Sequence, residues 1–179
     1  MSQDQRATDG LHLLMLEHHQ LEELYRGWRD AGALPAELRY RQACAFCCRL
    51  VVHSIVETQL FYRMLRVAGA APESGDEADI EQLLLDEIIG SLVRAGPDDV
   101  QLDHRMRMLG QLLREHVDLQ EHELFAAARV LRLDAAALGM GVAIVRGPVQ
   151  AGVLRRFERL RVLGQAERVD CPTPRNGPH

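Results

Sequence analysis

The chain has 179 residues, of which 47% are hydrophobic, so it is long enough to form one globular domain with a sizeable core. Its formal net charge is −5, and acidic and basic residues are scattered along the sequence, which argues against nucleic acid and anionic membrane surfaces as partners. The N-terminus has no basic and apolar leader, and no apolar run approaches the roughly 18 residues of a membrane span. A cytoplasmic protein is therefore expected.

Apolar residues repeat with the period of an α-helix along almost the whole chain, and proline or glycine falls at the junctions. Four long helices are expected over about residues 8–30, 35–67, 77–94 and 98–131, with a loop over 69–79. DAAALGMGVAIVRG and PVQAGVLRRFERLRVLG are expected to form two shorter helices divided at Gly147 and Pro148. The sequence thus predicts an all-α, up-down-up-down four-helix bundle with additional short C-terminal helices. Residues 1–165 would form this domain and residues 166–179 a disordered tail.

The second predicted helix has two polar groups within its inward stripe. That stripe comprises Ala43, Phe46, Leu50, His53, Glu57, Leu60 and Met64. His53 and Glu57 lie four residues apart, so they differ by only about 40° around the helix and can aim at one point. Burying an imidazole and a carboxylate without partners would cost several kcal/mol, which predicts a common partner for the pair.

Two other long helices also place a histidine on the inward face. His18 interrupts the apolar stripe of the first helix and His116 that of the fourth. A single histidine on such a face is more often a satisfied core residue than a ligand. Three histidines and a carboxylate at similar depth instead favour a metal ion, because imidazole and carboxylate suit iron, zinc or manganese. A hydrogen-bonded polar network without metal is the alternative.

The second helix also contains three of the four cysteines. Cys44 and Cys47 could hold a metal or form a redox pair, but no second CxxC completes a zinc site. Cys44 and Cys48 share a face with Val52 and Ile55, which favours a role as small buried apolar residues. This second apolar face could support a homodimer.

Three segments resemble the strongest motifs of the hemerythrin-like, or HHE cation-binding, domain family: LLMLEHHQLEELY, LVVHSIVETQLFYRML and LLREHVDLQEHELFAAARVL. The resemblance covers roughly residues 10–147, and LDAAALGMGVAIVRG is similar to the segment that closes that domain. It implies a bundle that holds a non-haem di-iron centre, bridged by carboxylates and an oxygen species and otherwise bound by histidines. It also implies metal ligation by His18, His53, Glu57 and His116.

Two helices depart from the family pattern. In EQLLLDEIIGSL, Gln82 stands where the family has a histidine, and Asp86, one turn later, is the nearby ionisable replacement. On the fourth helix, Gln120 stands where the HHE pattern has a glutamate, and Glu121 stands where hemerythrin proper has a carboxylate. Because Glu121 is five residues after the histidine, about 140° away on an ideal helix, it needs a local adjustment to reach the site. One iron or zinc ion is then an alternative to two.

Two functions of different classes fit these residues. The resemblance implies a binding or sensing protein whose non-haem iron takes up dioxygen or nitric oxide, or reports iron or oxidative status. The sequence contains no Ser-His-Asp set, phosphate loop or second catalytic domain, so turnover of an organic substrate is not predicted. The alternative is a helical interaction or regulatory module whose di-iron site has decayed, as Gln82 and Gln120 suggest.

Overall fold

Every regular element in the described part of the chain is a helix. The structure is a computed structural model that describes residues 9–69 and 75–170, with the side chains of residues 75–82 and 167–170 outside that description. The elements are α2 (Gly10–Asp30), α3 (Ala36–Gln59), α4 (Phe61–Val67), α5 (Gly75–Ala95), α6 (Leu102–Leu119), the π-helical segment η1 (Gln120–Leu124), α7 (Phe125–Val130) and α8 (Ala135–Asp170). The predicted all-α class is confirmed.

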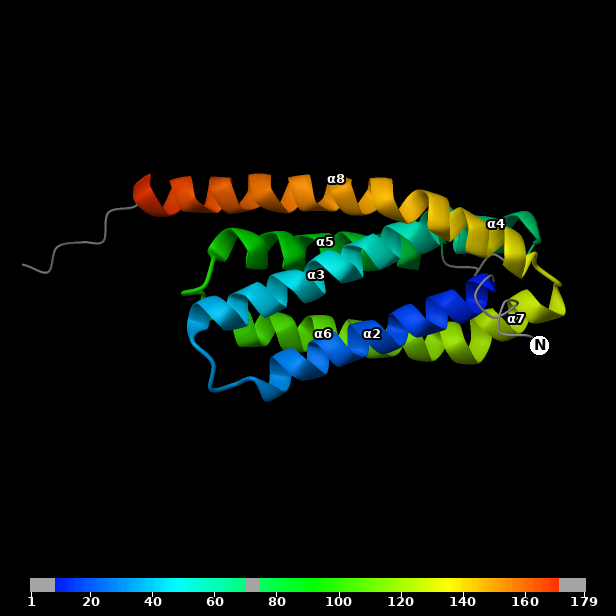
Figure 1. The fold of residues 1–179 in the computed structure, drawn as a ribbon, viewed down its shortest axis with the longest axis horizontal. Helices are drawn as coiled ribbons and strands as arrows, with labels where there is room; N and C mark the ends of the chain where they lie inside the picture. Colours follow the sequence, from blue (N-terminus) through cyan, green and yellow to red (C-terminus); the bar gives the residue numbers. More distant parts are fainter. Residues whose placement is uncertain (1–8, 70–74, 171–179) are drawn as a thin grey trace, which may run out of the picture.

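Four of these helices surround a common core. α2 contacts α3 and α6, and α5 contacts the same two helices. Figure 1 shows the four helices running lengthwise beside one another, with α8 laid along them. α8 contacts α2, α3 and α5, so it covers the flank of the bundle to which α3 belongs. The chain therefore forms the expected helical bundle with one more long helix than the sequence predicts.

The prediction for the C-terminal segment is wrong. The sequence predicts two helices divided at Gly147 and Pro148, whereas the structure has one helix with Pro148 inside it. A proline within a helix removes one N–H and crowds the preceding turn. Gly147 and Pro148 are exposed, so water can bond to the carbonyl that the proline leaves without a partner. Packing against three helices then keeps the two parts of α8 in line.

Several helix boundaries also differ from the predicted ones. α5 begins at Gly75, so residues 75–79 of the expected loop are helical, while residues 70–74 lie outside the described residues. The helix predicted over residues 35–67 is interrupted at Leu60, which separates α3 from α4. α8 continues to Asp170, past the predicted domain end at 165, and the rest of the expected tail lies outside the described residues.

Local sequence explains where several helices begin and end. The Asp9 carboxylate caps α2 by accepting from the backbone N–H groups of Leu11 at 3.0 Å and His12 at 3.2 Å. Pro35, with φ −52°, directly precedes α3. Gly96 follows α5 with φ 83°, a left-handed conformation that favours glycine. These local signals set how far along the bundle each helix reaches.

Two helical stretches are long and apolar enough to cross a membrane, judged by length and composition alone. They are Ala36–Val67, whose apolar window is half buried within the bundle, and Ala135–Ala166, which is less buried. The sequence predicts no run of that length. The first stretch contributes much of the bundle core, and core helices commonly meet the same criterion, so it does not by itself indicate a membrane span.

The interior of the bundle has two chemically different halves. The apolar half is built around Trp28, Tyr40, Phe46, Leu92 and Leu109, all buried in the main hydrophobic cluster. The buried polar and charged side chains in the described part of the chain belong to what we call the donor half: Glu17, His18, His53, Glu57 and Gln120. The candidate site therefore occupies one half of a bundle whose other half is conventionally packed.

Candidate metal centre

Three helices bring four donor side chains together. His18 comes from the middle of α2, His53 and Glu57 from the last two turns of α3, and His116 from the last turn of α6. The first three are buried, whereas the His116 side chain is 21% exposed. One ligand atom from each side chain lies within 4.8 Å of the others. The structure thus brings together four of the residues that the sequence predicts as ligands.

The three imidazole rings converge on one carboxylate. His18 Nε2 lies 3.6 Å from Glu57 Oε1, while the Nε2 atoms of His53 and His116 lie 3.2 and 3.0 Å from Glu57 Oε2. The rings are nearly perpendicular to one another, with interplanar angles of 78°, 84° and 82° and centroids 4.9 to 5.6 Å apart. This arrangement directs three ring edges toward one small region beside Glu57.

Two of these rings are fixed by carboxylates on their other nitrogen. His18 Nδ1 lies 2.8 Å from Glu121 Oε1, and His53 Nδ1 lies 3.0 Å from Glu17 Oε2. An ionised carboxylate can only accept, so each Nδ1 carries the hydrogen of its hydrogen bond. When the rings are neutral, both Nε2 atoms therefore face Glu57 as acceptors.

The imidazole Nε2 atoms and the Glu57 carboxylate that they face are all hydrogen-bond acceptors, so a cation between them is needed to satisfy them. The Nε2 atoms of His18, His53 and His116 and both carboxylate oxygens of Glu57 are buried, and none has a hydrogen-bond partner of acceptable geometry among the described residues. A buried carboxylate without compensation costs several kcal/mol. A metal ion would satisfy all five atoms at once, because neutral imidazole nitrogen and carboxylate oxygen are its usual ligands.

Burial and neighbouring charges shift the pKa values of the donor side chains in opposite directions. Burial is the largest influence on His53 and lowers its pKa to about 4 despite the nearby Glu57. Burial also opposes protonation of His18, but Glu57 and Glu121 outweigh it and raise its pKa above the ordinary value. For Glu57, burial opposes ionisation, yet His53 and His116 hold its pKa well below the usual range. The carboxylate therefore stays ionised, and of the two histidines with shifted pKa values His18 takes up a proton more readily than His53.

The π-helical segment explains how Glu121 reaches the site. A π-helix bonds i to i+5, so residues five apart lie near one face. η1 begins at Gln120, directly after α6, and Glu121 is five residues after His116. The Glu121 side chain is 30% exposed and contacts His18 from the rim of the site. The structure supplies the local adjustment that the sequence requires, and it places Glu121 on the Nδ1 side of His18 rather than beside Glu57.

Aromatic side chains close the inner side of the cluster. Phe125 stacks on His18 with an interplanar angle of 2° and a centroid distance of 5.9 Å. Phe61, the first residue of α4, contacts Phe125 edge-on at 5.4 Å, and neither phenylalanine is exposed. These rings exclude water and strengthen electrostatic interactions within the site. The cluster approaches solvent only on the side of His116 and Glu121, as far as the described residues show.

The structure places Asp86 away from this cluster. The buried face of α5 includes Leu85, Ile88, Ile89, Leu92 and Val93. Asp86 lies beside that face, is partly exposed, and pairs with Arg156 of α8 at 3.1 Å. The side chain of Gln82 lies outside the described residues. The prediction that Asp86 substitutes for a third-helix ligand finds no support in this geometry, because an α8 guanidinium already compensates its charge.

Gln120 is buried beside the donor set without adding charge to it. Its side-chain Nε2 donates to the Tyr62 hydroxyl at 2.9 Å, while its Oε1 atom is buried with no hydrogen-bond partner among the described residues. A carboxylate at this position would add a further buried negative charge to the donor half, which already holds Glu17 and Glu57. Because the Gln120 amide is neutral, it does not help to compensate the positive charge of bound metal ions.

Three residues near the site are missing from the sequence predictions. Glu17 lies beside His18 in sequence and points to His53, and Arg146 of α8 forms an ion pair with Glu17. Tyr62 contacts Gln120 after the chain bends at Leu60. Arg146 could have been recognised from the sequence, because it is the single charged residue between Ala135 and Leu154. The other two lie one residue beside a stripe or beyond a helix break, which helical periodicity does not resolve.

Fold and donor set together define an all-α bundle with a buried His/Glu metal site. The chain belongs to the hemerythrin family, because the family model described as hemerythrin HHE cation binding domain matches residues 9–128, more than half of the chain. No curated protein and no solved structure matches the chain at a significant level. The matched segment contains the four converging donors and ends before α8 begins.

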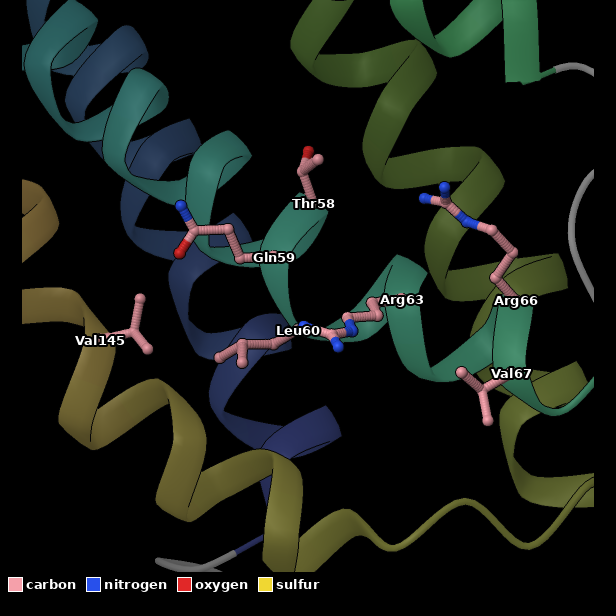
Figure 2. Close-up of a pocket in the computed structure, with 7 residues that line it drawn as sticks. All are labelled: Thr58, Gln59, Leu60, Arg63, Arg66, Val67 and Val145. Carbon is pink, nitrogen blue, oxygen red and sulfur yellow. The ribbon is translucent and has the colours of Figure 1, made fainter.

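Two surface hollows lie outside the donor cluster. An open depression of about 630 Å³ lies at the junction of α3 and α4. Figure 2 shows the side chains that line it: Thr58, Gln59, Leu60, Arg63, Arg66, Val67 and, from α8, Val145. Thr58 and Gln59 follow Glu57 but lie on the exposed side of α3. A groove of about 440 Å³ between α3 and α8 is lined in part by Cys44, Cys48, Arg146 and Phe157. Cys44 and Cys48 belong to the apolar face of α3 that the sequence suggests as a homodimer surface. In the structure α8 packs along this face.

Proposed function

We propose that this metal-binding bundle holds one non-haem iron ion, bound by His18, His53, Glu57 and His116, and that it binds or senses a diatomic ligand or reports iron or oxidative status. The observation that supports this function is the convergence of three imidazole Nε2 atoms on one buried carboxylate, all without hydrogen-bond partners among the described residues. Three nitrogen ligands and one oxygen ligand suit iron and also occur in zinc sites.

One ion is favoured over two by the position of the remaining carboxylates and amides. Among the described residues, the four donors are the one group of three or more His, Cys, Asp or Glu side chains that could hold an ion. Asp86 pairs with Arg156, and Gln120 is neutral. Glu121 is engaged by His18 at Nδ1. A second ion would lack both nitrogen ligands and a compensating bridging charge.

The surroundings of the site favour ligand binding over substrate turnover. Iron when bound supplies open coordination positions and a change of oxidation state, which suit dioxygen or nitric oxide. Phe61 and Phe125 keep the inner side apolar, and the partly exposed His116 marks the side from which a small ligand can approach. Glu17 and Glu121 orient two of the imidazoles. A cytoplasmic location is part of the same proposal.

The test is metal analysis of protein purified from iron-replete cells, combined with visible absorption spectra. We expect close to one iron per chain, and an absorption band that changes on reduction and on exposure to oxygen or nitric oxide. His53→Ala should abolish both metal and band. His19→Ala is the matched control, because His19 is exposed and pairs with Glu23 on the surface of α2.

Three results would count against the proposal. Stoichiometric zinc without a ligand-dependent band would retain the metal site but overturn the iron function. Two irons per chain would overturn the single-ion site. Metal-free protein that is folded and whose unfolding is unaffected by a chelator would favour the second function, a helical interaction module with a decayed site, which the buried neutral Gln120 also favours.

A further inference from the structure

A buried ion pair lies directly behind one of the four donors. Glu17 is almost fully buried, and its Oε2 accepts from His53 Nδ1 at 3.0 Å. Its other oxygen, Oε1, pairs with the guanidinium of Arg146. His53, Glu17 and Arg146 come from α3, α2 and α8. Three helices therefore meet in a single chain of polar contacts that begins beside Glu57 and ends at the guanidinium.

The Glu17 contact decides which nitrogen of His53 faces the donor cluster. A carboxylate on Nδ1 keeps the hydrogen there and leaves the Nε2 lone pair directed at Glu57. Carboxylates that hold the outer nitrogen of a metal-binding histidine fix both the ring orientation and the tautomer. Without Glu17, the buried His53 ring could turn or exchange tautomers, because Glu17 is the one hydrogen-bond partner of its Nδ1 among the described residues.

Arg146 in turn holds the Glu17 carboxylate in place. A carboxylate that is 5% exposed needs a cation, and Arg146 supplies one while remaining 32% exposed itself. The surrounding sequence of α8, AAALGMGVAIVRGPVQAGVL, is otherwise uncharged, so core packing of this segment does not explain the arginine. Arg146 also lines the groove between α3 and α8, which connects this pair to the surface.

We infer that Glu17 and Arg146 are a positioning pair that holds His53 ready to bind metal, so that α8 controls the affinity of a site to which it contributes no ligand. This inference rests on the proposed function for its main readout. It assigns a role to a helix that lies beyond the segment matched by the family. Neither residue touches the ion site directly, since Glu17 reaches it only through His53.

The test compares two arginines of the same helix. Arg146→Gln removes the guanidinium that holds Glu17, whereas Arg156→Gln removes another ion pair of α8, the more exposed one with Asp86 of α5, away from the donors. Affinity for iron(II), and for cobalt(II) as a spectroscopic probe, is measured by competition with a chromophoric chelator, and stability by urea unfolding. We expect Arg146→Gln and Glu17→Gln each to weaken metal binding about 10- to 100-fold, as loss of such outer contacts does.

Three further results distinguish positioning from a general loss of structure. Arg146→Lys should restore part of the affinity, because an ammonium can still hold Glu17. The double variant Glu17→Gln/Arg146→Gln should lose little more than either single variant, because both act through His53. The cobalt absorption band should shift in the Arg146→Gln and Glu17→Gln proteins and not in Arg156→Gln. Wild-type affinity and spectrum in Arg146→Gln, or an equal loss in Arg156→Gln, would overturn the inference.

A further measurement distinguishes failure of the proposed metal site from failure of the positioning role. If the wild-type protein binds neither iron nor cobalt, the metal site is rejected, and the pair is tested in the metal-free protein by the ¹⁵N shifts of the imidazole rings at neutral pH. We then expect His53 as the Nδ1–H tautomer in wild type and Arg156→Gln, and a mixture of tautomers in Arg146→Gln. The same single tautomer in all three proteins would reject the positioning role.

Discussion

The two halves of the bundle are built from the same helices but are stabilised in different ways. In the apolar half, Phe46 is fully buried against Tyr25, and the Tyr40 hydroxyl donates to the carbonyl of Val93 at 2.7 Å. In the donor half, three imidazole nitrogens and the Glu57 carboxylate face one another without hydrogen bonds among the described residues. The apolar half is held by packing, although Trp28 Nε1 is buried there without a hydrogen-bond partner among the described residues, whereas the polar atoms of the donor half would be satisfied together by a cation.

This difference indicates how the chain can keep a costly site. The apolar half supplies the packing that holds α2, α3 and α6 together, and these are the helices that carry the four donors. The donor half gives up stability, since its polar atoms are desolvated without equivalent partners. Stability and function are thus separated along the length of the bundle rather than between its core and its surface.

The strongest test of this separation is damage to the apolar half. Phe46→Ala removes a fully buried ring and should lower the free energy of unfolding by about 3–5 kcal/mol. Urea unfolding should show a similar loss with and without bound metal, because the ring lies away from the donors. A loss seen only in one of the two states would show that the halves are coupled.

Removal of the metal should produce the next largest effect. An ion present at 100 times its dissociation constant stabilises the folded state by about 2.7 kcal/mol, because it binds the folded chain preferentially. We expect chelation to lower the free energy of unfolding of the wild-type protein by that amount and to leave His53→Ala unchanged. Equal unfolding curves for wild type with and without metal would contradict a cation-completed donor half.

Restoring the carboxylate that the family pattern has at position 120 should lower the stability of the metal-free protein and raise its affinity for metal. Gln120→Glu adds a buried negative charge to the donor half and should destabilise the metal-free protein by about 1–3 kcal/mol. The same variant should bind metal more tightly, or bind a second ion, as metal analysis would show. Gln165→Glu, on the exposed surface of α8, is the control and should change neither quantity.

The smallest expected effect is a pH dependence carried by Glu121. The pKa of His18 is raised in the folded protein, in part by Glu121, so their contact stabilises the metal-free protein fully below the unfolded-state pKa near 6.5. That stability is lost as the pH rises through the folded-state pKa. Glu121→Gln should therefore cost about 1 kcal/mol at pH 5 and less at pH 9.

Unfolding in urea with chelator present, at both pH values, measures this difference. Glu123→Gln is the matched control, because Glu123 is exposed in the same π-helical segment. A cost of Glu121→Gln that is equal at pH 5 and pH 9, or larger at pH 9, would contradict the assignment.

The sequence predicted those parts of the molecule that depend on helical periodicity. His18, His53, Glu57 and His116 all interrupt apolar stripes, so their convergence followed from placing four stripes around one core. The need for a local adjustment at Glu121 could also be seen, since its spacing from His116 does not suit an ideal α-helix.

Other features depend on tertiary contacts that periodicity does not report. Its place one turn after Gln82 predicts Asp86 as a ligand, but in the structure Asp86 pairs with Arg156, 70 residues away. Pro148 indicated a break in α8, and packing of the whole helix outweighed that local preference. Glu17 faces His53 rather than solvent because Arg146 lies beside it, which no pattern within α2 can show.

The position of α8 also bears on what counts as an autonomous folding unit. Leu138, Val142, Val153 and Phe157 of this helix are buried in the main hydrophobic cluster, although they lie beyond residue 128, where the family match ends. A fragment trimmed to the matched segment would keep every donor and yet expose the apolar flank that these side chains cover. Such a fragment would be prone to self-association, so the boundary of sequence similarity is narrower than the boundary of the fold.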